Sequence, residues 1–175
     1  MSAITLAEAP AAPAPSHRLI VAIIIVAALE AIGAAWDVPS MLYDYDHGTT
    51  LLNVAQVMTK AKIGLAFIVA SAALWFSATA RPRLAVGLLG ALATLRWTLE
   101  VPTSWMIHGV ELDGGLLGVV VFAQQFVYPL IGVAALALAW RNEHLNVATV
   151  LVALPPLASI TMIAAFAFAV MIYGF

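Results

Sequence analysis

The sequence predicts an all-α integral membrane protein with five transmembrane helices, and three observations support this fold class. First, 64% of the 175 residues are hydrophobic and only 9% are charged, whereas a soluble domain carries about 25% charged residues. Second, five apolar segments reach the ~20 residues that a helix needs to cross a bilayer. Third, basic and acidic residues alternate between the loops that join these segments. Cysteine is absent, which excludes disulfides and thiol catalysis, and no basic run indicates nucleic-acid binding.

The apolar segments follow one another with short polar interruptions. Residues 1–17 are rich in Ala and Pro, so we expect a disordered tail, and no positive n-region marks them as a signal peptide. Tight turns at "ARPR" (80–83) and "RNEH" (141–144) separate the second span from the third and the fourth from the fifth. The predicted transmembrane domain covers 18–175, with spans at about 19–38, 51–79, 84–107, 116–140 and 147–173.

Loop charges predict the orientation of the bundle. Four arginines fall on one side of the predicted membrane: Arg18, Arg81, Arg83 and Arg141. Acidic residues gather on the other side: Asp37, Asp44, Asp46, Glu111 and Asp113. By the positive-inside rule, the arginine side is cytoplasmic. We therefore expect a bacterial-type inner (plasma) membrane protein with a cytoplasmic N-terminus and a periplasmic C-terminus.

Two parts of the chain resemble each other. The stretches "WDVPSMLYDYDHG" (36–48) and "LEVPTSWMIHG" (99–109) each place a carboxylate before Val-Pro and end on His-Gly. The helices that follow carry "AQVMTKAKIG" (55–64) and "AQQFVYPLIG" (123–132). Two parallel repeated hairpins (spans one and two, spans three and four) with an appended fifth helix would explain this, and chance similarity between apolar helices is the alternative. In each copy, we expect the proline to end or bend its helix at the outer interface.

Polar side chains concentrate in the outer half of the predicted spans. Counting about 1.5 Å per residue from the cytoplasmic arginines places Glu30 and Arg96 roughly 18–20 Å across the membrane, and Glu100 further out. An ionised group at this depth needs a partner, water or the bundle interior. We expect Arg96 or a lysine of the second span to reach Glu30, and Arg96 to be able to pair with Glu100. The predicted ligand-binding residues are Glu30, Asp37, Lys60, Arg96, Glu100, Gln124 and Tyr128.

These residues predict a polar cavity that faces the periplasm. We expect it to bind a small polar, ionic or amphipathic ligand, and the protein to act as a carrier or as a subunit of a membrane complex. The expected partners are the lipid bilayer and either further copies of the chain, in a homo-oligomer, or the other subunits of a larger membrane complex. Two alternatives stay open. One is a membrane enzyme, such as an isomerase or cyclase, with acid–base chemistry on a hydrophobic substrate. The other is a structural accessory subunit whose charges pair with a partner chain. The charges could also have a purely structural role, in which ion pairs hold the helices together and Lys60 and Lys62 extend to lipid headgroups. The sequence identifies no catalytic residue and no cofactor.

Two histidines lie in the acidic outer loops. His47 and His108 have about the same predicted depth, and imidazole with carboxylates suits a borderline divalent ion, while a histidine pair suits haem. Their spacing matches no metal-binding motif, and neither lies deep in a span. We therefore predict no metal site and keep His47 and His108 as weak candidates for metal or haem ligands.

Overall fold

The computed structural model describes residues 16–43, 49–108, 115–142 and 144–174. These residues form five α-helices, each of which is long and apolar enough to cross a membrane. Their bounds differ from the predicted spans by at most two residues at either end, so the all-helical, five-span prediction is confirmed at this level. The helices are α1 (His17–Asp37), α2 (Thr50–Ala78), α3 (Pro82–His108), α4 (Gly115–Arg141) and α5 (Leu145–Tyr173), and a short 3-10 helix, η1 (Val38–Leu42), follows α1.

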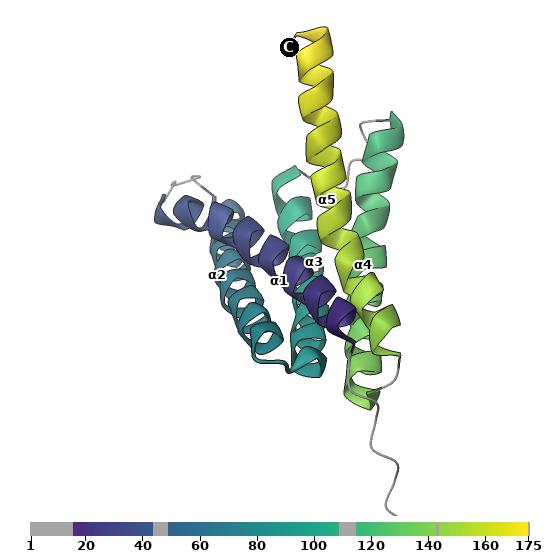
Figure 1. Ribbon diagram of the computed structural model, residues 1–175. Coiled ribbons are helices and arrows are strands. Elements are labelled where there is room, and N and C mark those ends of the chain that lie inside the picture. Colours follow the sequence, from purple (N-terminus) through teal and green to yellow (C-terminus); the bar gives the residue numbers. More distant parts are fainter. Residues whose placement is uncertain (1–15, 44–48, 109–114, 143, 175) are drawn as a thin grey trace, which may run out of the picture.

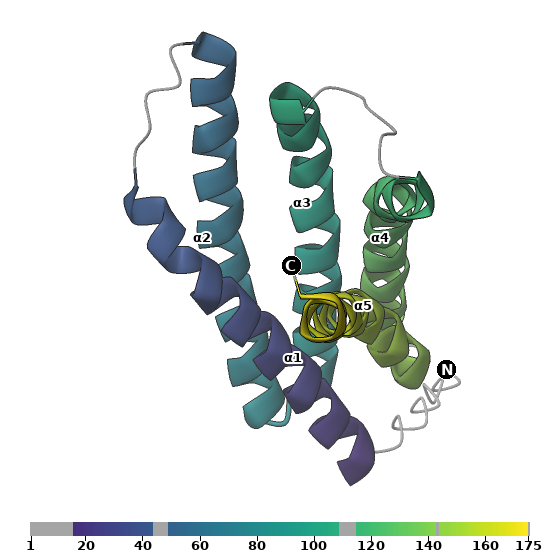
Figure 2. The same cartoon turned by 90° about the horizontal axis from the view of Figure 1, so that it is seen from above.

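The helices form two layers. α2, α3 and α4 stand side by side in a row, and α1 and α5 lie across one face of that row (Figures 1 and 2). The α2–α3 and α4–α5 connections lie at one end of the bundle, together with the start of α1 (Figure 1). This end therefore carries Arg18, Arg81, Arg83 and Arg141, as the alternation of loop charges predicts.

The arginine-bearing end of the bundle is closely packed. Its core consists mainly of alanines and branched aliphatic residues from all five helices. Small side chains let helices approach closely in membranes, where packing rather than the hydrophobic effect drives their association. Gly90 of α3 and Gly132 of α4 show how close the approach is: a Cβ on Gly90 would lie 2.8 Å from the Gly132 carbonyl oxygen. The fully or nearly fully buried members of this core include Ile23, Ala27, Ala73, Ala85, Val86, Ala135, Ala139 and Ala148.

At the arginine-bearing end of the bundle, Arg83 in the first turn of α3 forms hydrogen bonds with the C-terminus of α4. The Arg83 Nε donates to the Ala139 carbonyl oxygen at 2.8 Å, and its guanidinium also donates to the carbonyl of Trp140. The last carbonyls of a helix lack intrahelical donors, and a cation there also interacts favourably with the helix dipole. Arg83 thus caps α4 in addition to contributing to the loop charge.

The two Val-Pro sequences behave differently. α1 ends at Asp37, and the chain continues as η1 with Pro39 in its first turn. α3 instead continues through Pro102 to His108. The prediction that each proline ends or bends its helix is therefore confirmed after Asp37, where α1 ends. α3 runs through Pro102, in agreement with the predicted span 84–107, because one missing N–H donor does not stop a helix whose neighbours hold it in place. A bend at Pro102 stays a prediction. The structure does not establish the repeat, which stays a prediction.

The second half of α5 is mostly exposed, and its C-terminal end extends beyond the other helices (Figure 1). Its large apolar side chains are exposed on several sides of the helix, among them Ile163, Phe166, Phe168 and Met171. This surface is apolar enough to contact lipid or another membrane helix.

Candidate functional site in the polar layer

Glu30 and Arg96 meet between α1 and α3. The Arg96 Nη1 lies 3.3 Å from the Glu30 Oε2, which is both a hydrogen bond and an ion pair. The Glu30 side chain is only 12% exposed, whereas 39% of the Arg96 side chain is exposed. The expected contact between Glu30 and a basic residue of another span is therefore present, and Arg96 is its partner.

A second ion pair joins α2 to α3. The Lys62 ammonium group contacts the Glu100 carboxylate, and both side chains are partly buried. Arg96 was expected to be able to pair with Glu100, four residues later on the same helix. In the structure, Arg96 turns toward α1 and Glu100 turns toward α2, because each has an oppositely charged residue on a neighbouring helix. Lys62 is thus the ion-pair partner of a partly buried carboxylate.

The two ion pairs line one cavity of about 410 Å³, which we call the polar cavity. It lies between the α2–α3 part of the helix row and the two covering helices. Three carboxylates and two cations face it, so its lining has one negative charge in excess. The lining residues are Glu30 and Asp37 of α1, Thr59, Lys62 and Ile63 of α2, Leu92, Ala93, Arg96, Trp97 and Glu100 of α3, and Pro155 and Ser159 of α5.

A second cavity of about 480 Å³, which we call the lateral groove, runs between α1 and α5. It shares four residues with the polar cavity: Glu30, Asp37, Arg96 and Ser159. The rest of its lining is apolar and includes the exposed side chains of Ile32, Trp36 and Ile163. The two cavities therefore meet at the Glu30–Arg96 pair, and the groove opens on the apolar outer surface of the bundle.

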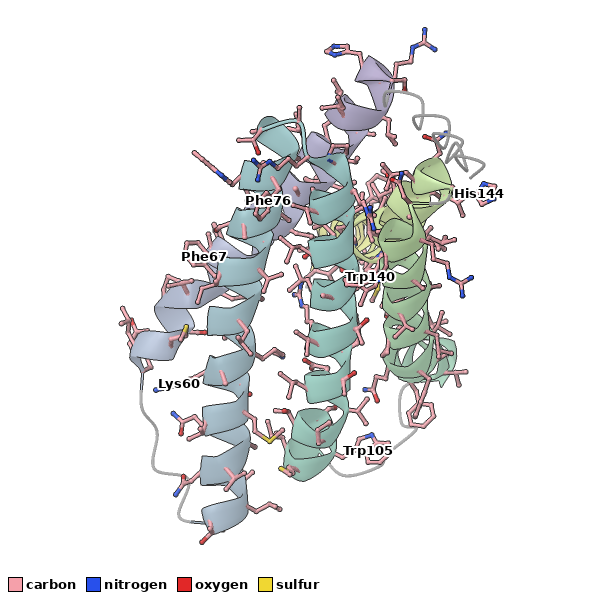
Figure 3. The ribbon with its side chains drawn as sticks, turned by 90° about the horizontal axis from the view of Figure 1, so that it is seen from below. Lys60, Phe67, Phe76, Trp105, Trp140 and His144 are labelled. Atoms are coloured by element: carbon pink, nitrogen blue, oxygen red, sulfur yellow. The ribbon has the colours of Figure 1, made fainter. Side chains whose placement is uncertain are left out.

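Four of the seven predicted site residues line the polar cavity, and three do not. Glu30, Asp37, Arg96 and Glu100 face it, while Lys60 lies on the side of α2 turned away from α3 (Figure 3). Tyr128 is buried behind the cavity wall, with its ring edge-on to Trp97 at a centroid distance of 4.8 Å. The Gln124 amide lies 4.0 Å from the Met162 sulfur of α5.

Several lining residues were not predicted, and helical spacing could have found some of them. Thr59, Lys62 and Ile63 recur at three- and four-residue intervals, so they share one face of α2. Lys60 lies about 200° around the helix from Lys62 and so faces elsewhere. Trp97 is four residues after Ala93 and three before Glu100, so the same spacing places it on the cavity face of α3. Ser159 gave no such signal, because a single hydroxyl in an apolar span is common.

The predicted weak metal ligands lie outside the described residues. His47 is not described, nor is the side chain of His108. Within the described part of the chain, no group of three or more His, Asp or Glu side chains could hold a metal ion.

The length and composition of its helices define the chain as a helical, multi-pass membrane protein. Within this class, it is distinguished by a charged cavity between two helix layers. No protein-family model matches the chain, and no curated protein or solved structure matches it either.

Proposed function

We propose that the protein binds a small polar, ionic or amphipathic ligand in the polar cavity, as a carrier or as a subunit of a membrane complex of the bacterial inner membrane. The observation that carries this proposal is a cavity of about 410 Å³ lined by two ion pairs from three helices. A bundle that needed only to pack could use small apolar residues here, as it does at its other end. Charges within a membrane are costly, so their concentration around a cavity favours a ligand site.

The ion pairs favour binding over the acid–base alternative. Glu30 and Glu100 each hold a cation, so two of the three carboxylates that line the cavity are already paired and only Asp37 is left as a base. Of the two residues that could stabilise an oxyanion, Tyr128 does not line the cavity, and Arg96 lines it but is already paired with Glu30. The exposed second half of α5 supports the subunit form of the proposal, because its aromatic side chains would suit a neighbouring membrane helix.

The ligand can be sought by mass spectrometry of molecules that co-purify with the protein in a mild detergent. Ser159→Trp places an indole at the junction of the two cavities and should abolish retention of the bound molecule. Thr161→Trp is the matched control, because Thr161 is an exposed α5 residue that lines neither cavity and, like Ser159, bonds the carbonyl four residues earlier. If no small molecule distinguishes the two variants, the proposal is wrong.

The proposed orientation has its own test. Alkaline phosphatase fused after Phe175 should be active, because the proposed topology places this end in the periplasm. The same enzyme inserted between Arg81 and Arg83 should be inactive, because the arginine-bearing end is cytoplasmic in the proposal. A green fluorescent protein fusion at the same two sites should give the opposite pattern. Active phosphatase at the arginine turn would contradict the orientation.

A further inference from the structure

We infer that the ligand is an amphipathic cation: its positively charged head binds beside Asp37 in the polar cavity, and its apolar tail lies in the lateral groove between α1 and α5. This inference rests on the proposed function and adds the chemical class of the ligand. Its starting point is the junction of the two cavities, which share Glu30, Asp37, Arg96 and Ser159.

The sign of the head group follows from the charges at the junction. Arg96 is neutralised by Glu30, and Lys62 is neutralised by Glu100, so neither cation is left for an anionic ligand. Among the described residues, Asp37 forms an ion pair with no basic side chain, although it lines both cavities. A carboxylate at the membrane interface without a counter-ion is complementary to a cation. An anion would instead have to break one of the two existing pairs.

The tryptophans that line the two cavities agree with a cationic head. Trp97 lines the polar cavity and Trp36 lines the lateral groove, so an indole is present on each side of the junction. Indole faces attract ammonium groups, and the attraction extends to quaternary ammonium ions, which cannot donate hydrogen bonds. A carboxylate that shares each of its two cavities with a tryptophan thus suits a substituted ammonium ion.

The lateral groove supplies the site for a tail. Its lining extends along α1 from Leu29 to Asp37, a rise of about 12 Å. Beyond the four shared residues, this lining is entirely apolar or glycine, and Ile32 and Ile163 border it where it meets the outer surface. A ligand dissolved in the bilayer would therefore reach the groove sideways, between α1 and α5, without crossing water.

Gly33 keeps this groove open. A Cβ added at Gly33 would meet no atom within 4 Å, so a larger side chain there would occupy the groove without displacing a helix. This allows the groove to be filled while the packing of the bundle is left unchanged.

The test compares three probes with the full-length protein in a non-ionic detergent: decyltrimethylammonium, decanoate and tetramethylammonium. Native mass spectrometry should show one decyltrimethylammonium ion bound per chain. Asp37→Asn should weaken this binding by about tenfold or more, because it removes a charge-assisted contact, and Asp37→Glu should retain it. Tetramethylammonium should bind more weakly than decyltrimethylammonium, because it lacks the tail.

The tail is tested at a single position. Gly33→Trp should abolish the binding of decyltrimethylammonium, while Gly33→Ala, whose methyl group meets open space, should retain it. Ile25→Trp, at an exposed α1 position that lines neither cavity, is a second control and should also retain it.

The outcomes separate the inference from the proposed function. If decanoate binds and Gly33→Trp or Ser159→Trp abolishes its binding, the ligand class is wrong and the proposed function stands. If decyltrimethylammonium binds equally to wild type, Asp37→Asn and Gly33→Trp, the probe associates with the apolar surface alone and the inference is overturned. If no probe binds and no co-purifying molecule responds to Ser159→Trp, both the inference and the proposed function are wrong.

Discussion

Arg96→Gln should destabilise the protein more than Glu30→Gln does. Removing Arg96 leaves the Glu30 carboxylate, whose side chain is 12% exposed, without its counter-ion, whereas removing the Glu30 charge leaves a guanidinium that is 39% exposed. Loss of one partner of a buried ion pair costs on the order of 3 kcal/mol, mainly because the other charge remains buried. Thermal unfolding in detergent, followed through the fluorescence of the five tryptophans, measures both effects.

The double variant Glu30→Gln/Arg96→Gln should recover much of the lost stability, because neither charge is left alone. It should not recover ligand binding, since the polar cavity loses two of its five charged lining residues. Arg81→Gln, which changes an exposed arginine outside the cavity, serves as the control for the loss of a positive charge. Recovery of both stability and binding in the double variant would show that the pair is structural only. A Glu30→Gln variant less stable than Arg96→Gln would contradict the burial argument.

Gly90→Ala should also be strongly destabilising, although it adds only one methyl group. The new Cβ would lie 2.8 Å from the Gly132 oxygen and 2.9 Å from the Leu136 nitrogen. Both are backbone atoms of α4, so the two helices must move apart, and overpacking of this kind costs about 1–3 kcal/mol. Because α3 also carries Arg96 and Glu100, the shift should weaken ligand retention as well. Heating followed by size-exclusion chromatography measures the remaining folded fraction.

The matched control for Gly90 lies one helical turn earlier. A Cβ on Gly87 would lie 3.8 Å from the Leu136 Cδ1, which is an ordinary contact. Gly87→Ala should therefore be neutral or slightly stabilising, since alanine is the better helix former by about 1 kcal/mol. Equal loss of stability in both variants would mean that the helices are not held at this glycine contact.

Much of the fold could be predicted from the sequence, because the bilayer limits what an apolar chain can form. The apolar lengths identify all five helices, and the turns "ARPR" and "RNEH" separate neighbouring helices that run in opposite directions. The contact between Glu30 and Arg96 was also predictable, because two opposite charges at one depth have few other ways to reduce their cost.

Rotation about the helix axes was the weaker part of the prediction. Depth counts placed Lys60, Gln124 and Tyr128 in the polar layer, but depth does not say which way a side chain faces. Lys62 faces the polar cavity and pairs with Glu100, whereas Lys60 lies on the other side of α2 (Figure 3). Applying the helical period to α2 would have separated the two lysines, whereas on α5 Ser159 is the single polar residue of the cavity lining, so no pattern of polar residues indicates it.

The sequence by itself determined that the chain is an apolar bundle with five membrane-length helices and that its loop arginines share one end. It also determined that the charged side chains within the helices lie in the half of the bundle away from those arginines. These properties depend only on composition and on position along the helix. The tertiary structure decided which charges pair, because α1 crosses the helix row and brings Glu30 to Arg96, while α2 brings Lys62 to Glu100. It also decided that α5 packs beside α1, which creates the lateral groove and joins it to the polar cavity at Asp37. Such contacts depend on the packing of side chains from helices far apart in the chain, and no local pattern of residues encodes them.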